Sequence, residues 1–254
     1  MTVLDILLAD VPTGWRVTDV HVGANWVVAL VHHSDGTTRA GVAATPHPVA
    51  SDAAFQPGHT ALDRDAEQIA QGLRSPDMTA AAVALATLNA LNQPDERLLT
   101  TDDAADWLSA QSAGRSIAIF GRFPFIEEEV RPFASRVWVF EQEPQPGELG
   151  GEDVGAVLSQ ADIVAITGSS VINHTIDGIL SQVRHGCVTV ILGPSTPLSV
   201  KLLDSGIDAL FGVSAVDVPS LIRTVAAGSG FQKVEGLRRV ALFRRESPKV
   251  RGGL

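Results

Sequence analysis

The stretch Ser116–Glu129, SIAIFGRFPFIEEE, has the layout of the first strand, turn and helix of a nucleotide-binding α/β fold. A largely apolar run at 116–120 is followed by Gly121, and Pro124 suits the first position of a helix. A phosphate-binding loop would need further glycines at fixed spacing, but three glutamates stand at 127–129 instead. Carboxylates stabilise a helix N-terminus and repel a diphosphate. The stretch therefore predicts the fold without the usual dinucleotide pose.

The rest of the C-terminal half repeats this alternation of strand and helix. Further strand-like runs lie at 136–141, 162–167, 187–192 and 208–213. The intervening helices are expected at Pro124–Ala134, Asp153–Gln160, Thr175–Arg184, Leu198–Asp204 and Ala215–Ala227. Short apolar runs separated by helices are typical of a parallel sheet covered on both faces. We expect an α/β fold with a Rossmann-like doubly wound parallel sheet over 96–254. One more strand is expected at Leu237–Arg245, before a basic tail that includes Lys249 and Arg251.

Residues 1–95 follow a different pattern and predict a smaller α+β domain. Extended segments are expected at Arg16–Val22, Trp26–Val31 and Arg39–Ala43, with the hairpin signal Asp35-Gly36 between the last two. Helices are expected at Val3–Asp10, at Leu62–Leu73, whose apolar residues have helical spacing, and at Asp77–Asn92, which is rich in alanine.

Composition narrows the functional classes. The formal charge of −10 argues against nucleic-acid binding, which needs Lys and Arg to neutralise phosphates. No run is long enough to span a membrane, and the N-terminus lacks the basic region of a signal peptide, so a cytoplasmic protein is expected. The single cysteine, Cys187, excludes an internal disulfide framework. The expected partner is a small molecule or a metal ion, and an apolar α+β half is compatible with a homodimer.

In open α/β sheets ligands bind beyond the carboxyl ends of the strands, so the residues after each strand are the first candidates. The candidate ligand-binding residues are Gly121, Phe123, Pro124, Glu141, Thr167, Gly168, Ser169, Asn173, Thr175, Gly193, Pro194 and Ser195, joined by Asn89 from the alanine-rich helix. Glu141 lies twenty residues past Gly121, the offset at which an acid binds ribose hydroxyls in Rossmann domains. Turn formation and helix capping would explain many of these residues equally well. For Asn89, packing between domains and ligand contact are both open.

The histidines give no zinc signature, because no pair has HExxH spacing and no CxxC is present. His21, His32, His33, His47 and His59 are scattered through the N-terminal half, so any metal site there would be assembled from distant segments. In the C-terminal half, Glu141, Asn173 and His174 offer oxygen and nitrogen donors and form the candidate metal set.

The motifs FGRFP, VFEQEPQPGE, DIVAITGSSVINHTIDGIL, VILGPSTPLS and SGIDALFG, which lie between residues 116 and 230, resemble the DUF364 family, described as a heavy-metal chelation domain. Residues 5–93 resemble the DUF4213 domain that precedes it, through AAAVALATLNALN among others. The resemblance implies an enolase N-terminal-like domain joined to a Rossmann-like domain, with a site in the cleft between them.

Three functions follow from these observations. The first is a metal-handling protein that binds a divalent ion in the cleft between the domains. The second is an enzyme acting on a small polar metabolite, with an adenosyl cofactor such as S-adenosylmethionine whose ribose Glu141 would hold. The third is a non-catalytic module whose polar loops only pack the two domains. The sequence names no reaction, since no serine lies in a GxSxG motif.

Overall fold

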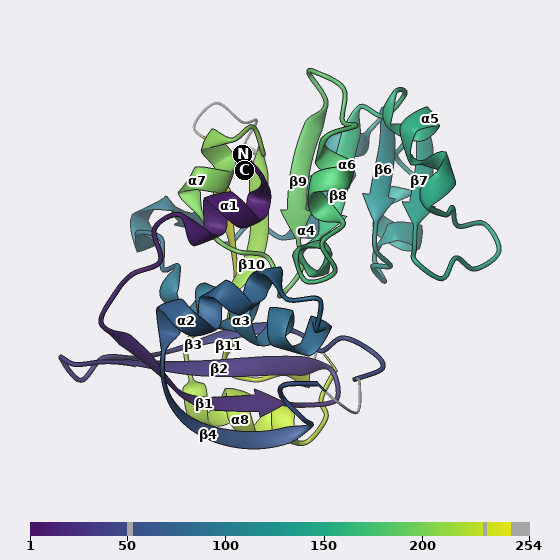
Figure 1. Ribbon diagram of the computed structural model, residues 1–254. Coiled ribbons are helices and arrows are strands. Elements are labelled where there is room, and N and C mark those ends of the chain that lie inside the picture. Colours follow the sequence, from purple (N-terminus) through teal and green to yellow (C-terminus); the bar gives the residue numbers. More distant parts are fainter. Residues whose placement is uncertain (50–52, 231–232, 245–254) are drawn as a thin grey trace.

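The structure is a computed structural model that describes residues 1–49, 53–230 and 233–244. It contains two sheets, a four-stranded antiparallel sheet near the N-terminus and a seven-stranded, mostly parallel sheet that follows it (Figure 1). Arg245 and the basic tail with Lys249 and Arg251 lie outside the described residues. Within the described residues, no helix is long and apolar enough to cross a membrane.

The N-terminal sheet has the strand order β3-β2-β1-β4, with antiparallel pairing throughout. The elements of this half are α1 (Val3–Leu8), β1 (Trp15–Val22), β2 (Trp26–His33), β3 (Thr38–Ala44), β4 (Gly58–Asp65), α2 (Ala66–Ala70), the 3-10 turn η1 (Gln71–Arg74) and α3 (Met78–Leu91). The expected hairpin at Asp35-Gly36 is confirmed, and Gly36 has a φ of +91°, which favours glycine.

The prediction of a helix over Leu62–Leu73 is wrong in its first third. Residues 58–65 form β4, which pairs with β1, and the helix begins only at Ala66. Asp65 marks the boundary because its side chain accepts hydrogen bonds from the backbone N–H groups of Glu67 and Gln68, which caps the helix. Leu62 fits the helical spacing but belongs to the strand.

The antiparallel sheet is covered on both faces. The alanine-rich α3 packs on one face so closely that a Cβ on Gly41 of β3 would lie 2.1 Å from the carbonyl oxygen of Ala86. The helix α8 (Val218–Ala226) of the C-terminal half packs on the other face, where Leu221 and Val225 contact Val28. The N-terminal sheet is thus held between a helix of its own domain and one of the next (Figure 1).

The second sheet has the order β5-β11-β10-β9-β8-β6-β7. Its elements are the 3-10 turn η2 (Glu96–Leu98), β5 (Leu99–Thr100), α4 (Ala104–Ser112), β6 (Ser116–Phe120), the π-helical turn η3 (Ile126–Val130), β7 (Arg136–Phe140), the 3-10 turn η4 (Gly151–Asp153), α5 (Val154–Leu158), β8 (Ile163–Thr167), the 3-10 turn η5 (Gly168–Val171), α6 (Ile176–Leu180), β9 (Val188–Leu192), α7 (Val200–Asp204), β10 (Ala209–Ala215), α8 and β11 (Leu237–Phe243). The strands β6 to β10 are parallel, and β11 is antiparallel to β10. The expected Rossmann-like α/β class is confirmed.

Several connecting helices are shorter than predicted. The segment 124–134 holds only the π-helical turn η3, and α5, α6 and α7 have five residues each. Ala215, the expected start of the last helix, is instead the end of β10, where it pairs with Leu237. The extra pairing with β11 extends β10 at the expense of the helix.

Numbered along the chain, the five parallel strands have the order 2-1-3-4-5, one of the two common doubly wound orders. The order reverses between β6 and β8, so their carboxyl ends are where ligands bind in such sheets. In Figure 1 the arrowheads of β6, β7 and β9 point toward the side of the N-terminal domain.

One apolar core joins the two halves. The same cluster of buried residues contains Leu73 and Leu85 of the first half and Ile176, Leu198 and Leu202 of the second. The two halves therefore pack as one body.

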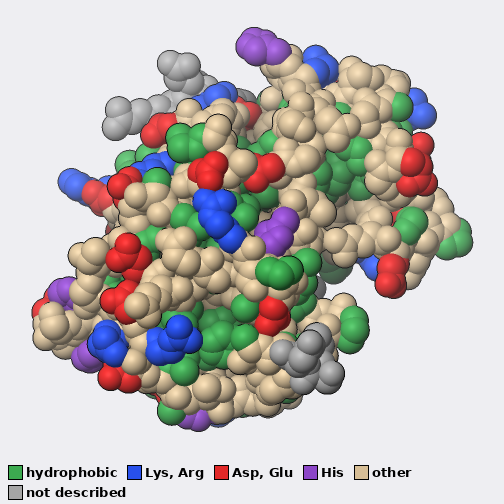
Figure 2. Space-filling view, viewed as in Figure 1, with side chains coloured by type: hydrophobic (Ala, Val, Ile, Leu, Met, Phe, Trp, Pro, Cys, Tyr) green, Lys and Arg blue, Asp and Glu red, His purple; other side chains and the backbone are tan. Residues whose placement is uncertain are grey.

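On the outside, Figure 2 shows acidic and basic side chains interspersed over the visible face, without a large patch of one sign. This face therefore offers no continuous basic surface for a polyanion.

Candidate functional site

Four of the predicted ligand-binding residues border an open cavity at the carboxyl edge of the parallel sheet. Phe123 and Pro124 follow β6, while Gly193 and Pro194 follow β9. The cavity has a volume of about 1000 Å³. All of its described lining residues belong to the C-terminal half, so it lies beside the junction of the domains and not across it.

A second group of predicted residues shapes the turns behind this edge. Gly121 has a φ of +113°, and a Cβ there would lie 3.0 Å from Cβ of Thr167. Gly168 brings two loops together, since a Cβ on it would lie 2.5 Å from the backbone nitrogen of Thr196. Thr167 Oγ1 accepts a hydrogen bond from the backbone N–H of Ser169 at 3.4 Å. These contacts explain the small residues of this region by backbone geometry.

Two further predicted residues make contacts between the domains. Ser195 is buried, and its Oγ accepts a hydrogen bond from the backbone N–H of Ala44 at 2.8 Å. Asn89 donates from Nδ2 to the carbonyl oxygens of Val42 at 2.9 Å and of Ser195 at 3.3 Å. The amide nitrogen of Asn89 thus takes part in the packing of the domains, while its buried Oδ1 has no partner among the described residues. Ligand contact by Asn89 stays a prediction.

The candidate metal set of Glu141, Asn173 and His174 is spread over different contacts. His174 donates from Nε2 to the carbonyl oxygen of Leu73 at 2.8 Å, which ties the turn before α6 to the N-terminal half. Asn173 Oδ1 accepts from Thr175, from its Oγ1 at 2.7 Å and from its N–H at 3.2 Å.

Glu141 is half-buried after the edge strand β7, where burial raises the pKa of its carboxyl group against the opposing effect of Arg122. Arg122 itself forms a two-pronged ion pair with Glu148, at 2.7 and 2.8 Å. Metal binding by Glu141 with Asn173 and His174 stays a prediction.

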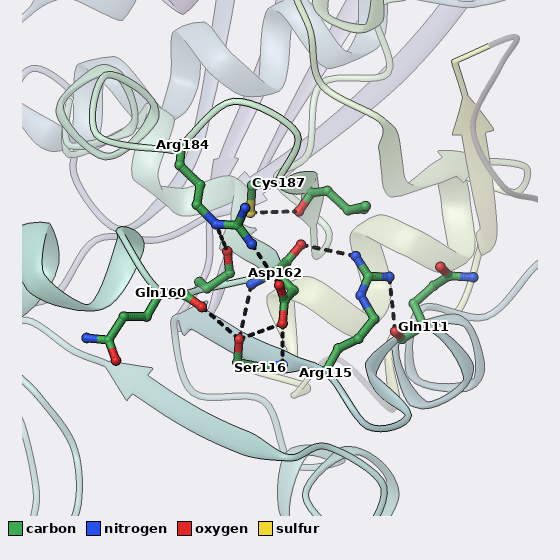
Figure 3. A network of polar contacts seen from close by, with 9 residues as sticks. Gln111, Arg115, Ser116, Gln160, Asp162, Arg184 and Cys187 are labelled. Atoms are coloured by element: carbon green, nitrogen blue, oxygen red, sulfur yellow. Dashed lines mark hydrogen bonds and ion pairs between the residues drawn. The ribbon is translucent and has the colours of Figure 1, made fainter.

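The amino edge of the same sheet is closed by polar contacts (Figure 3). Asp162, just before β8, accepts hydrogen bonds from the backbone N–H of Ser116 at 2.9 Å and from Arg184 Nη2 at 2.7 Å. Arg115 donates to the carbonyl oxygen of Asp162 at 3.1 Å. Cys187 lies beside this network, and burial raises the pKa of its thiol to about 11. Each charged side chain drawn there has a partner, so the network ties the strands of this edge together.

Among the residues that the structure describes, one group of three or more Asp, Glu, His or Cys side chains has ligand atoms close enough together to share an ion. This group lies on the N-terminal sheet. It consists of Asp19 and His21 of β1 and His59 of β4, and one ligand atom from each lies within 4.8 Å of the others. His59 Nε2 is 2.7 Å from Asp19 Oδ1. The rings of His21 and His59 stack with centroids 4.5 Å apart.

Strand register brings these three residues together. His21 and His59 are directly opposite each other in the antiparallel pair of β1 and β4, where side chains are about 5 Å apart at Cβ. Asp19 and His21 are two residues apart and share one face of β1. That face is opposite to the buried Val20 and Val22, so the group lies on the side of the sheet where α8 packs.

An irregularity in β1 is responsible for the outward direction of Asp19. Strict alternation from Val17, which is buried, would turn Asp19 toward the core. The register against β2 instead steps from Val17 opposite Val31 to Asp19 opposite Leu30, which leaves Thr18 as an extra residue. Such a β-bulge reverses the alternation, and bulges are frequent beside functional sites because they redirect a side chain.

The electrostatics of the group favour a metal ligand set at neutral pH. The hydrogen bond from His59 lowers the pKa of Asp19, so this carboxylate is ionised. Burial lowers the pKa of His21, with a smaller contribution from His59 that outweighs the attraction of Asp19, so its imidazole is neutral and able to coordinate. Asp19 and His59 keep 30% and 50% of their side chains exposed, which leaves a path for an ion.

This group does not follow from the sequence patterns. No strand is predicted at His59, and a helix is predicted from Leu62 onward, so the pairing of His59 with β1 is not expected. The signal that was present is the break in alternation within WRVTDVHV at 15–22, where apolar residues at 15 and 17 are followed by apolar residues at 20 and 22. A one-residue slip of this kind indicates a bulge that turns Asp19 and His21 to the other face.

Comparison with known proteins gives two family matches and two closely similar folds. Residues 103–244 match the DUF364 family and residues 4–92 match DUF4213, both described as "Putative heavy-metal chelation". A DUF364 protein of unknown function from Desulfitobacterium hafniense DCB-2 is 19% identical, with 95% of this chain and 96% of that chain covered and a TM-score of 0.79. One from Pyrococcus horikoshii is also 19% identical, with 94% and 99% covered and a TM-score of 0.80. No curated protein matches the sequence.

Proposed function

Because the chain belongs to the DUF364 family, we propose that it binds a divalent heavy-metal ion, with Asp19, His21 and His59 as the ligands. The observation that carries the proposal is the convergence of two imidazoles and one carboxylate, with ligand atoms within 4.8 Å, from segments forty residues apart in the sequence. The family description is the same for both halves of the chain, which agrees with a site in the N-terminal half.

The donor atoms determine the class of metal. Two imidazole nitrogens and one carboxylate oxygen suit borderline ions such as Zn²⁺, Ni²⁺ and Cu²⁺, whereas Ca²⁺ and Mg²⁺ prefer oxygen ligands alone. A thiolate would favour softer ions. The only cysteine, Cys187, is at the amino edge of the other sheet, so it is not part of this group.

The number of ligands indicates an exchangeable ion. Structural zinc sites have four protein ligands, while three leave a position for water or another ligand. In a tetrahedral site with bonds of about 2.0–2.1 Å, two donor atoms are roughly 3.3 Å apart. His59 Nε2 and Asp19 Oδ1 are 2.7 Å apart in the hydrogen-bonded pair, so an ion bound by both atoms would separate them slightly and leave the hydrogen of the His59 ring on Nδ1.

The site expected from the sequence, between the domains with Glu141, Asn173 and His174, is a weaker candidate for the same function. One nitrogen of His174 is held by Leu73 and the amide oxygen of Asn173 by Thr175. At the junction, a cavity of about 20 Å³ lies beside Asn89 and Asn92. A cavity of that size holds about one water molecule.

Isothermal titration of metal-stripped protein with Zn²⁺ and Ni²⁺ tests the proposal. We expect one ion per chain, and a loss of affinity of about 100-fold or more in His59→Ala and His21→Ala, since loss of an outer-shell partner alone costs 10- to 100-fold. His32→Ala is the matched control, because His32 is an exposed histidine of the same sheet, bonded to Thr38 and outside the group. Equal affinity in the wild type and both triad variants would contradict the proposal.

A further inference from the structure

The cavity at the carboxyl edge of the parallel sheet is large enough for a ligand of its own. Its volume of about 1000 Å³ is at the upper end of the range for small-molecule sites, roughly 300–1,000 Å³. It is bordered by the loops after β6 and β9, by β10 and β11, and by the start of α4. This is the edge at which doubly wound sheets bind ligands, and it is in a different domain from Asp19, His21 and His59.

One wall of the cavity is flat and apolar. The rings of Phe123 and Phe125 stack at a centroid distance of 5.6 Å with an angle of 30° between their planes. Leu192, Phe211 and Val240 add further apolar surface. Aromatic walls of this kind bind a planar ring by stacking and can also attract a cation through the face of the ring.

The charged side chains of the lining are mostly acidic. Among the described residues they are Asp102, Asp103, Asp106, Glu128 and Glu129 against Lys233 and Arg239. Asp103 and Arg239 form an ion pair at 3.1 Å, so four carboxylates face one ammonium group.

Glu128 and Glu129 differ from their neighbour in the chain. Glu127 is held by Arg131 through two hydrogen bonds of 2.7 and 2.8 Å and does not line the cavity. Glu128 and Glu129 line it, and their carboxylates have no hydrogen-bond or ion-pair partner within the described part of the chain. An anion entering the cavity would meet uncompensated negative charge, whereas a cation would gain from it.

We propose that this cavity binds a small organic cation that carries a planar ring, with the ring against Phe123 and Phe125 and the positive charge toward Glu128 and Glu129. Volume, apolar wall and charge each restrict the ligand independently. Nucleotides with free phosphates are disfavoured by the carboxylates, and inorganic cations would leave the apolar wall unused.

Three probes that share an adenosine group and differ in net charge provide the test. S-adenosylmethionine is positive, S-adenosylhomocysteine has no net charge and adenosine monophosphate is negative. By isothermal titration we expect binding to weaken in that order, and the double variant Glu128→Gln/Glu129→Gln to lose about tenfold for the positive probe and little for the uncharged one. Glu127→Gln is the matched control and should bind as the wild type does.

Two results would overturn the proposal. One is an affinity that does not depend on the charge of the probe or on Glu128 and Glu129; the other is no binding of S-adenosylmethionine at millimolar concentration. Phe125→Leu should weaken the positive and uncharged probes alike, and circular dichroism would show that each variant is folded. Metal binding by the wild type can be measured on the same samples, so this proposal and the metal proposal can fail separately.

Discussion

The two sheets present their polar side chains in different places. In the parallel sheet, polar residues gather at the two edges, with a closed network around Asp162 at the amino edge and an open cavity at the carboxyl edge. In the antiparallel sheet, the metal ligand candidates lie on a face, where His21 of one strand meets His59 of the next. Edge sites follow from topology alone, but a site on a face also depends on register, so the second kind is the harder to foresee.

The largest effect on stability is expected where the amino edge of the parallel sheet is most buried. Asp208, with 8% of its side chain exposed, accepts a hydrogen bond from the backbone N–H of Thr189 at 2.9 Å and pairs with Arg244. Asp208→Ala would leave that buried N–H without its partner, at a cost of about 2 kcal/mol in the free energy of unfolding. Thermal unfolding should show a midpoint lowered by roughly 4–8 °C.

Asp162→Ala is the matched comparison, because Asp162 binds Ser116 in the same way but with 38% of its side chain exposed. Water can replace part of what is lost, so we expect about half the effect, near 1 kcal/mol. Zn²⁺ affinity should be unchanged in both variants. A loss of metal binding in either one would break the distinction between a structural edge and a metal-binding face.

An intermediate effect is expected from pH on metal binding. The pKa of His21 is lowered by burial, so its imidazole remains neutral as the pH falls to the ordinary histidine value of about 6.5. A protonated imidazole cannot coordinate a metal ion. Zn²⁺ affinity should therefore change little from pH 7.5 to 6.5 and fall by about tenfold toward pH 5, where imidazoles take up protons. Titrations at a series of pH values check this, and an affinity that rises on acidification would exclude histidine ligands.

The smallest effect on stability and metal binding is expected from replacing the single cysteine, Cys187. Burial raises the pKa of Cys187 to about 11, so little thiolate exists at pH 8 and iodoacetamide should react roughly 100-fold more slowly than with a free thiol. Cys187→Ala should alter the unfolding free energy by less than about 1 kcal/mol and leave metal affinity as it was. Rapid alkylation would show that the amino edge is more open than the contacts of Asp162 indicate. Weaker metal binding in the variant would show that Cys187 takes part in the metal site.

Much of the fold could be predicted because its signals are local. The runs at 116–120 and 187–192 are short, apolar and flanked by turn residues, which identifies buried parallel strands whatever their neighbours are. The helix lengths were less predictable. Only Pro124 and a row of acids marked the segment after β6, and they fit a single π-helical turn as well as a longer helix.

The candidate site was predictable only in part. Phe123, Pro124, Gly193 and Pro194 could be placed at the cavity because parallel strand ends converge. Asp19, His21 and His59 could not, since no strand was expected at His59 and a helix was expected over the last four residues of β4. The bulge at Thr18 changes the face to which every following side chain points, and only the break in the apolar alternation at 15–22 indicates it.

The most direct test of the central claim is an anomalous difference map from crystals soaked in Zn²⁺, recorded at the zinc absorption edge. The account predicts one strong peak on the face of the N-terminal sheet where α8 packs, about 2.0–2.2 Å from a nitrogen of His21, a nitrogen of His59 and an oxygen of Asp19. A peak at Glu141 and His174 would move the site to the junction of the domains. Bound zinc with no density at Asp19, His21 and His59 would contradict the account.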